Sequence, residues 1–169
     1  MLAHLARNAD SHVRRTQAAI KGAVVDQYVG GADGRAAQIE ATARQPAAQL
    51  IDDVKRSAEA VVSAWRSAPA DAWTAITRDV SGRERPLYEL PARRWQEVEI
   101  HLVDLGIGFT HRDWTDEFVS AWLPQTRARM ADRLPKGFAF PHLEDRRDEL
   151  AWLYGRLQRK DLPTLPPWG

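Results

Sequence analysis

Glu97 and His101, a glutamate and a histidine four residues apart, are of the types and at the spacing that could bind a metal ion. On an α-helix this spacing stacks the two side chains on one face about 5 to 6 Å apart, close enough to share one ion. At about 100° per residue, Glu99 points away from this pair and is the poorer ligand candidate. Asp104 returns to the side of Glu97 one turn beyond His101, where its carboxylate could orient the imidazole.

The same helical geometry places the Glu97–His101 pair at the border of an apolar arc that we expect to be buried. The arc extends over about 100° of the helix. Its members are Pro91, Trp95, Val98, Leu102 and Leu105, with Arg94 at the end nearest the pair.

A third candidate ligand, His4, lies at the edge of the apolar face of a helix predicted over residues 2–25. That face consists of Leu2, Leu5, Ala9, Val13, Thr16 and Ile20. If the two helices are neighbours, His4, Glu97 and His101 converge as a site of two histidines and one carboxylate with open coordination positions, which is typical of a catalytic metal. A divalent ion held there keeps a net charge of +1 and can bind a thiolate or polarise a carbonyl group.

Spacing alone leaves a simpler interpretation open. A glutamate and a histidine four apart often occur by chance in a helix, where they form a surface contact worth a few tenths of a kcal/mol. The remaining histidines, His12, His111 and His142, have no ligand partner at a useful spacing. We interpret these three as structural or surface residues.

Composition describes a soluble globular protein: 44% of the 169 residues are hydrophobic and 28% are charged. The net charge of +1 argues against a nucleic-acid or membrane binder, because no broad basic field can attract a polyanion. No apolar run approaches the ~20 residues of a membrane span, and the N-terminus lacks the pattern of a signal peptide. We therefore expect a cytoplasmic protein.

The chain contains no cysteine. A zinc–thiolate cluster, a disulfide and a thiol nucleophile on the protein are therefore all excluded. Any sulfur chemistry has to arrive on a cofactor.

Apolar spacing predicts helices along almost the whole chain. After the first helix we expect a helix over residues 35–44, a long helix that Pro46 opens, and a helix from Pro91 to Gly106 or Gly108. We further expect helices over 118–123 and 126–134, on either side of Pro124, and a short helix over about 144–158. The helix after Pro46 carries an apolar stripe of Leu50, Ile51, Val54, Ala58, Val61, Val62 and Trp65. No segment alternates convincingly enough to predict a strand. The expected architecture is an all-α bundle over residues 1–135, followed by a short helix and a proline-rich tail over 136–169.

Several segments, in this order, resemble the N-terminal domain of the mycothiol-dependent maleylpyruvate isomerase family, whose members are DinB-like metal-binding helical bundles. They are His4-Leu5-Ala6-Arg7-Asn8-Ala9-Asp10, Gly30-Gly31-Ala32 with Arg35 and Ile39-Glu40, the run from Arg94 to Gly106, and Asp113-Trp114. The resemblance covers roughly residues 2–123 and implies a DinB-like antiparallel helical bundle. The tail from Trp152 to Trp168 also resembles segments of this family.

The resemblance implies a divalent metal bound by His4, Glu97 and His101, most often zinc, with nickel and iron as alternatives. It also implies mycothiol as the thiol cosubstrate, whose thiolate would add to a cis double bond of a small electrophile. Rotation about the resulting single bond and elimination of the thiolate would then give the trans product. Arg94 would hold a substrate carboxylate.

Further implied roles concern polar side chains near the ligands. Asp104 would support His101, and Arg7 and Asn8 would make polar contacts with the thiol cofactor.

The sequence departs from the family pattern in two places. Only three residues precede His4, whereas family members carry a further helix upstream. A true start upstream of the given one, the helix near 115–134, or a second subunit in a homodimer are three ways to cover this end. The isomerase also has an additional C-terminal domain, for which the 45 residues after Pro124 are too few. A different mycothiol-dependent S-transfer is thus an alternative activity, and a non-catalytic metal-binding or dimerising bundle with a regulatory or structural role is the alternative from another class.

Overall fold

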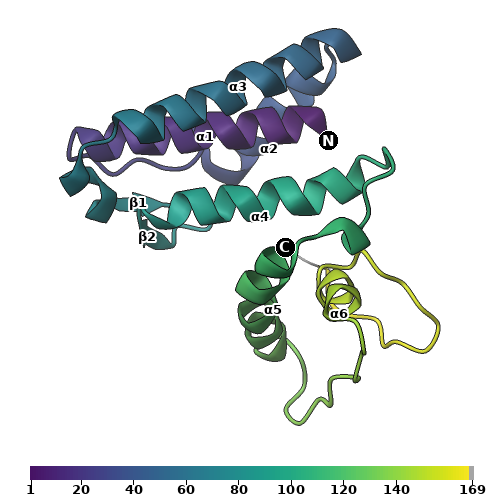
Figure 1. Cartoon of the computed structure of the whole chain (residues 1–169). Helices are drawn as coiled ribbons and strands as arrows, with labels where there is room; N and C mark the ends of the chain where they lie inside the picture. Colours follow the sequence, from purple (N-terminus) through teal and green to yellow (C-terminus); the bar gives the residue numbers. More distant parts are fainter. Residues whose placement is uncertain (168–169) are drawn as a thin grey trace. The chain divides into compact units, whose positions relative to one another are not determined.

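Helices dominate residues 1–167, the part of the chain that this computed structural model describes. They are α1 (Leu2–Ile20), α2 (Gly31–Ala43), α3 (Ala47–Ser67), α4 (Glu89–Asp104), α5 (Asp116–Ala131) and α6 (Arg146–Leu153), with 3-10 turns at Ala70–Thr74 and His111–Asp113 (Figure 1). The mainly helical class is confirmed. Trp168, at the end of the expected tail, lies outside the described residues. None of the described helices has the length and apolar character that crossing a membrane requires.

The described chain packs as two compact units, Met1–Glu97 and Val98–Gly169. The division falls inside α4, which runs through it as one continuous helix. It differs from the boundary near residue 135 that we expected from sequence. Because a grouping by packing does not measure independent folding, the expected domain boundary stays a prediction.

In the first unit α1 and α3 pack side by side (Figure 1). The stripe predicted for α3 is only partly buried, since Ile51 and Val62 remain 45% and 41% exposed. Asp53 and Ser57 are buried instead. The reason is an ion pair: Arg7 of α1 donates to Asp53 at 2.7 Å, which turns the polar side of α3 toward α1.

The first helix is shorter than predicted because glycine ends it. Gly22 has φ +68°, a left-handed conformation that glycine adopts without strain. Its N–H and that of Ala23 bond to the carbonyls of Ala19 and Ala18 and close the last turn. Residues 21–25 are therefore outside the helix that we expected to include them.

A short antiparallel hairpin, β1 (Ile76–Arg78) and β2 (Glu84–Pro86), corrects the expectation that no strand is present. Three-residue strands are too short to show an alternating pattern in the sequence. The turn is held by Asp79, whose carboxylate accepts hydrogen bonds from the backbone N–H groups of Ser81 and Arg83 and from the Arg85 side chain. Gln27 Oε1 also accepts the Val80 N–H at 2.9 Å, which attaches the hairpin to the loop after α1.

The helix α4 follows the hairpin and begins where Leu87 and Leu90 enter a small core. This core also contains Ala19 of α1 and Ala72 of the first 3-10 turn. Anchoring the start of α4 to the end of α1 fixes the register between these helices. The residues along α4 thereby reach defined partners along α1.

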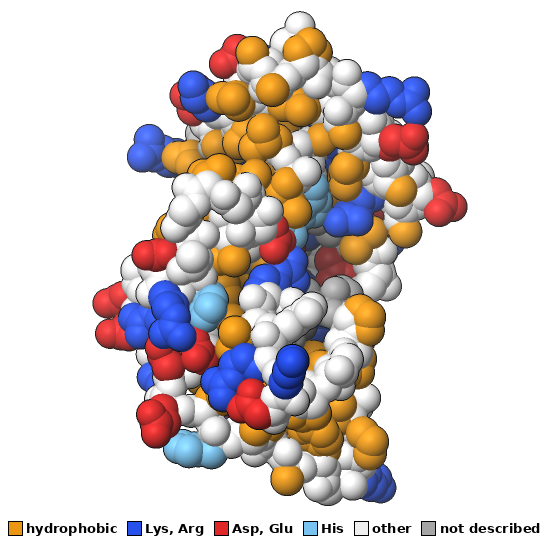
Figure 2. Space-filling model, turned by 90° about the vertical axis from the view of Figure 1, so that its right-hand side faces the viewer, with side chains coloured by type: hydrophobic (Ala, Val, Ile, Leu, Met, Phe, Trp, Pro, Cys, Tyr) orange, Lys and Arg blue, Asp and Glu red, His pale blue; other side chains and the backbone are white. Residues whose placement is uncertain are grey.

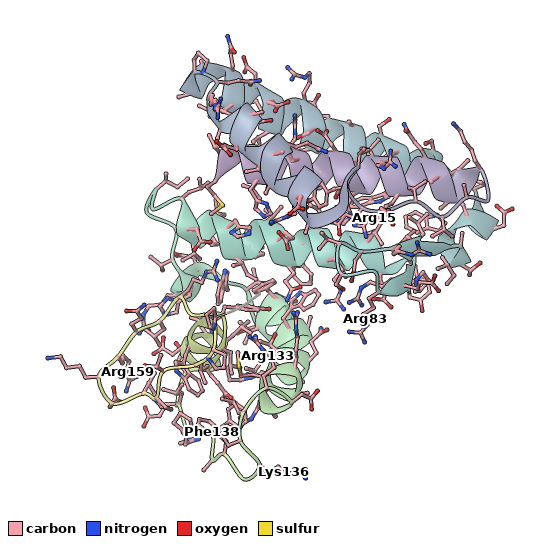
Figure 3. The ribbon with its side chains drawn as sticks, turned by 180° about the vertical axis from the view of Figure 1, so that it is seen from behind. Arg15, Arg83, Arg133, Lys136, Phe138 and Arg159 are labelled. Atoms are coloured by element: carbon pink, nitrogen blue, oxygen red, sulfur yellow. The ribbon has the colours of Figure 1, made fainter. Side chains whose placement is uncertain are left out.

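In the second unit α5 packs against α6. Their common core includes Trp114, Phe118, Leu150 and Tyr154, all under 2% exposed. Figure 3 labels Lys136 and Phe138 in the loop that joins these two helices. The last helix covers Arg146–Leu153 and is shorter than the predicted 144–158.

The break predicted at Pro124 is wrong, because α5 is one helix from Asp116 to Ala131. Proline removes one helical hydrogen bond and usually kinks a helix. Here Leu123 and Thr126, on either side of it, are both buried against the core, and the Gln125 side chain donates to the Ala121 carbonyl at 2.7 Å. Packing thus holds the helix together across the proline.

Candidate metal centre

The helices α1 and α4 run antiparallel (Figure 1), and each carries a row of mostly polar residues at helical spacing. The α1 row is His4, Asn8, Ser11 and Arg15, and the α4 row is Leu90, Arg94, Glu97 and His101; both have the spacing i, i+4, i+7, i+11 that lines one helix face. His4 Nε2 lies 3.0 Å from Glu97 Oε2. Further along α1, Arg94 donates to Asn8 Oδ1 at 2.8 Å and to the Leu5 carbonyl at 3.0 Å.

His101 is one turn beyond Glu97 on the same continuous helix. One potential ligand atom from each of His4, Glu97 and His101 lies within 4.8 Å of the others. All three side chains are partly exposed, so an ion or a small molecule can reach them. The structure thus brings together the three residues that the sequence selected. Two imidazoles and a carboxylate are a donor set that suits zinc or another divalent transition metal.

A carboxylate orients His101. Asp104 Oδ2 lies 2.7 Å from His101 Nδ1, which leaves Nε2 for a ligand. Arg156 donates to both oxygens of Asp104, at 3.0 and 2.7 Å. Partial burial raises the pKa of Asp104, but the hydrogen bonds from Arg156 and His101 outweigh it and the pKa is lowered. A carboxylate held ionised in this way fixes the ring of a metal-binding histidine.

Arg35 is a neighbour of this cluster that we did not select as a site residue from the sequence. Its guanidinium nitrogen Nη2 lies 3.3 Å from His4 Nδ1, on the opposite side of the ring from Glu97. The start of α2 positions it: at Gly34 an added Cβ atom would lie 1.8 Å from the Val29 carbonyl oxygen, so only glycine fits there. Arginine at residue 35 has no metal-ligating chemistry, and therefore a search for ligands could not find it.

Comparison with known proteins identifies the family of this chain. Residues 1–106, more than half of the chain, match the family described as the mycothiol maleylpyruvate isomerase N-terminal domain. This chain belongs to that family. No curated protein is similar enough in sequence to count as a relative.

Two solved structures share the fold of this isomerase-family chain. The crystal structure of the mycothiol-dependent maleylpyruvate isomerase has a TM-score of 0.84 and 22% identity, and covers 99% of this chain and 80% of its own. A histidine-to-alanine mutant of that enzyme has a TM-score of 0.85, 21% identity and the same coverage. Sequence identity of 21–22% together with these TM-scores shows a shared fold. The match spans nearly all of this chain, residues after Pro124 included, and covers 80% of the solved isomerase's chain.

Three other predicted site residues of this family member are engaged inside the protein. Arg94 is 7% exposed and donates to the Leu5 carbonyl and to Asn8 Oδ1, both on α1. Burial lowers the pKa of Arg94. Asn8 is buried and accepts the hydrogen bond from Arg94, and Arg7 forms ion pairs with Asp10 and Asp53. The structure therefore shows these side chains holding α1, α3 and α4 together, and their roles toward substrate and thiol stay predictions.

The apolar arc predicted for α4 is corrected by the structure. Trp95 and Val98 are 36% and 38% exposed, whereas Leu90, Arg94 and Ile100 are buried. Around the helix the buried Arg94 and Ile100 therefore lie on either side of the candidate pair, while the Glu97 and His101 side chains themselves stay partly exposed. Polar contacts to α1 determine which side turns inward, and hydrophobicity alone could not show this.

The histidines outside the cluster fit the structural interpretation where their environment is described. His12 is 1% exposed and meets Trp65 edge-on at a centroid distance of 5.8 Å. Burial, with the nearby charges of Arg15 and Arg94, lowers the pKa of His12 well below its usual value. His111 contacts Asp148 at 2.8 Å.

Proposed function

We propose that this chain is a metal-dependent enzyme that uses mycothiol to isomerise a small cis-unsaturated acid of the maleylpyruvate type. The observation that carries the proposal is the convergence of His4, Glu97 and His101 within 4.8 Å. Membership of the isomerase family and the shared fold support it. Figure 2 shows acidic and basic side chains interspersed on the visible face, which fits a small-molecule substrate better than a polyanion.

Within this proposal His4, Glu97 and His101 would hold the divalent ion, with zinc the first choice for two imidazoles and a carboxylate. A bound ion favours the ionised thiolate of the cosubstrate by lowering the thiol pKa. The chain itself supplies no thiol, since it has no cysteine. Asp104 keeps His101 turned toward the site through its bond to Nδ1.

The proposed reaction is balanced without any redox step. The thiolate sulfur forms a bond to one carbon of the cis double bond, and the electron pair moves to the carbonyl-conjugated end. The former double bond is then single and can rotate. Loss of the thiolate restores the double bond in the trans geometry and regenerates the cosubstrate.

The test combines metal content with thiol-dependent turnover. We expect wild-type protein, incubated with zinc and desalted, to contain about one zinc per chain by elemental analysis. Conversion of maleylpyruvate should require mycothiol and should be lost in His4→Ala and Glu97→Gln, together with the zinc. Glu99→Gln, on the same helix, is the matched control and should keep both.

Two results would decide against this proposal. If wild-type protein takes up no zinc, the metal centre is wrong. If it binds zinc but converts neither maleylpyruvate nor related electrophiles with mycothiol, the non-catalytic metal-binding bundle becomes the better description. The S-transferase alternative would show as mycothiol consumed and joined to the substrate instead of regenerated.

A further inference from the structure

The guanidinium of Arg35 occupies one side of the His4 ring. It lies 3.3 Å from Nδ1 and also stacks over the Tyr28 ring at 5.9 Å from its centroid. On the other side, His4 Nε2 is 3.0 Å from Glu97 Oε2. Both ring nitrogens of His4 therefore have partners in this structure.

The chemistry of arginine fixes the direction of these contacts. A guanidinium group has only donors, so Nδ1 of His4 must accept the hydrogen bond from Arg35. A neutral imidazole that accepts at Nδ1 carries its hydrogen on Nε2. That hydrogen is then donated to Glu97. This is a self-consistent arrangement for His4 without a metal ion.

Ligation of a metal by His4 is incompatible with the same contacts. If the ion binds Nε2, the hydrogen of the neutral ring moves to Nδ1, which can no longer accept from Arg35. If the ion binds Nδ1, it takes the lone pair that Arg35 uses. The Arg35–His4 hydrogen bond is lost in either case.

Other arginines close to the site are already engaged by protein groups, as Arg156 is by Asp104. Arg7 is bound by Asp10 and Asp53, and Arg94 by acceptors of α1. Among residues 1–167, Arg35 forms no ion pair with a carboxylate. Once released from His4, it is a half-exposed cation next to a metal ligand.

We propose that metal binding at His4 releases Arg35, and that the released guanidinium then holds a carboxylate of the substrate. This inference rests on the proposed function, because it assigns to that site the residue that recognises an anionic substrate. Guanidinium groups bind carboxylates through two parallel hydrogen bonds, which fixes orientation as well as charge. Arg35 takes the role that the sequence suggested for Arg94.

The first experiment measures zinc affinity by competition with a chelator. Arg35→Gln should bind zinc about tenfold more tightly than wild type, because the competing donor is gone and the glutamine oxygen can accept from Nδ1–H. Arg44→Gln removes the same charge from the end of the same helix and should match wild type. The tenfold ratio should persist in about 1 M salt, where the screening length falls to about 3 Å and simple charge repulsion disappears.

Nuclear magnetic resonance of the histidine ring nitrogens provides a second readout without activity. In metal-free wild type we expect the ring hydrogen of His4 on Nε2. In the zinc form we expect it on Nδ1 if the ion binds Nε2. If the ion binds Nδ1 instead, the hydrogen bond from Arg35 to Nδ1 should be lost directly. Hydrogen on Nδ1 in the metal-free protein would overturn the inference, since Arg35 could not then donate to it.

The third measurement uses maleate, a stable dicarboxylate, as the probe in calorimetric titrations. Zinc-loaded wild type should bind maleate at least about tenfold more tightly than zinc-loaded Arg35→Gln, whereas Arg44→Gln should bind like wild type. Circular dichroism checks that each variant is folded.

The outcomes separate this inference from the proposed function. If wild type binds zinc and Arg35→Gln has the same affinity for zinc and for maleate, the role of Arg35 is wrong but the proposed function stands. Wild type that binds no zinc overturns both.

Discussion

Arg94 illustrates how the partners of a residue limit what it can do. It is nearly buried, carries no ion pair in the described chain, and donates to two acceptors on α1. Arg35 has the same guanidinium group but is half-exposed and contacts a ring nitrogen that a metal ion would need. From the sequence we selected only Arg94 as a site residue; burial and the surrounding acceptors distinguish the two arginines in the structure.

We predict that Arg94→Met lowers the free energy of unfolding by about 2 kcal/mol, measured by urea denaturation. The substitution leaves the Leu5 carbonyl and the Asn8 side chain without their donor, while relief of the buried charge offsets part of the loss. Arg93→Gln, one residue earlier and more exposed, is the control and should cost less than about 0.5 kcal/mol. Equal stability of both variants would show that Arg94 does not hold α4 to α1.

Asp104→Asn should weaken zinc binding about tenfold while leaving one zinc per chain at saturation. The amide is a weaker acceptor for His101 Nδ1 and loses the charge that Arg156 stabilises. Chelator competition measures the change. An unaltered zinc affinity would mean that the orientation of His101 does not depend on this carboxylate.

At the scale of elements, the hairpin between α3 and α4 depends on one ionised side chain. Although partial burial raises the pKa of Asp79, the hydrogen bonds from Ser81, Arg83 and Arg85 lower it overall. A carboxylate whose pKa is lower in the folded state stabilises the fold above its unfolded pKa, and this contribution is lost as the pH falls toward the folded pKa.

We therefore predict that Asp79→Asn lowers the free energy of unfolding by about 1 to 2 kcal/mol at pH 7. The difference from wild type should shrink as the pH falls below about 4, because Asp79 becomes protonated there in the unfolded chain, which stabilises that state, and only at lower pH in the folded protein. Denaturation curves at a series of pH values measure this. A difference that stays constant down to pH 3 would contradict the link to ionisation.

The elements also show what sequence patterns can and cannot predict. The existence and order of the helices follow from apolar spacing, because each helix has to bury one face. The hairpin was missed since its strands are three residues long, and Pro124 was misjudged because packing of Leu123 and Thr126 was invisible in the sequence. The end of α1 near Gly22 depends on the left-handed backbone conformation of that glycine, which the spacing of apolar residues does not encode.

For the whole molecule, the three candidate ligands could be brought forward from sequence because metal binding needs particular side-chain types at helical spacing, and the structure brings the three together. Helical geometry placed His4 at the edge of an apolar face, and the family resemblance then implied the same residue. The contacts of Arg35 with His4, and the exposed side of α4 around Trp95, depend on how helices meet in three dimensions. Neither could follow from a pattern along one helix.

Zinc should raise the melting temperature of the whole chain. An ion that binds only the folded state at 100 times its dissociation constant adds about 2.7 kcal/mol, which corresponds to roughly 5 to 10 °C for a chain of this size. His101→Ala should abolish the shift, and His142→Ala, outside the cluster, should leave it intact. Thermal denaturation with and without zinc measures both; an equal shift in the His101 variant would place the stabilising ion elsewhere.

The tight approach of Gly34 to the Val29 carbonyl offers an unusual handle on this protein. Adding a single methyl group there would force the first turn of α2 to move, and with it the attachment point of the neighbouring guanidinium. Every functional group around His4 would remain chemically unaltered. The Gly34→Ala variant would thus separate two effects of Arg35 on the His4 site: the effect of its position and the effect of its charge.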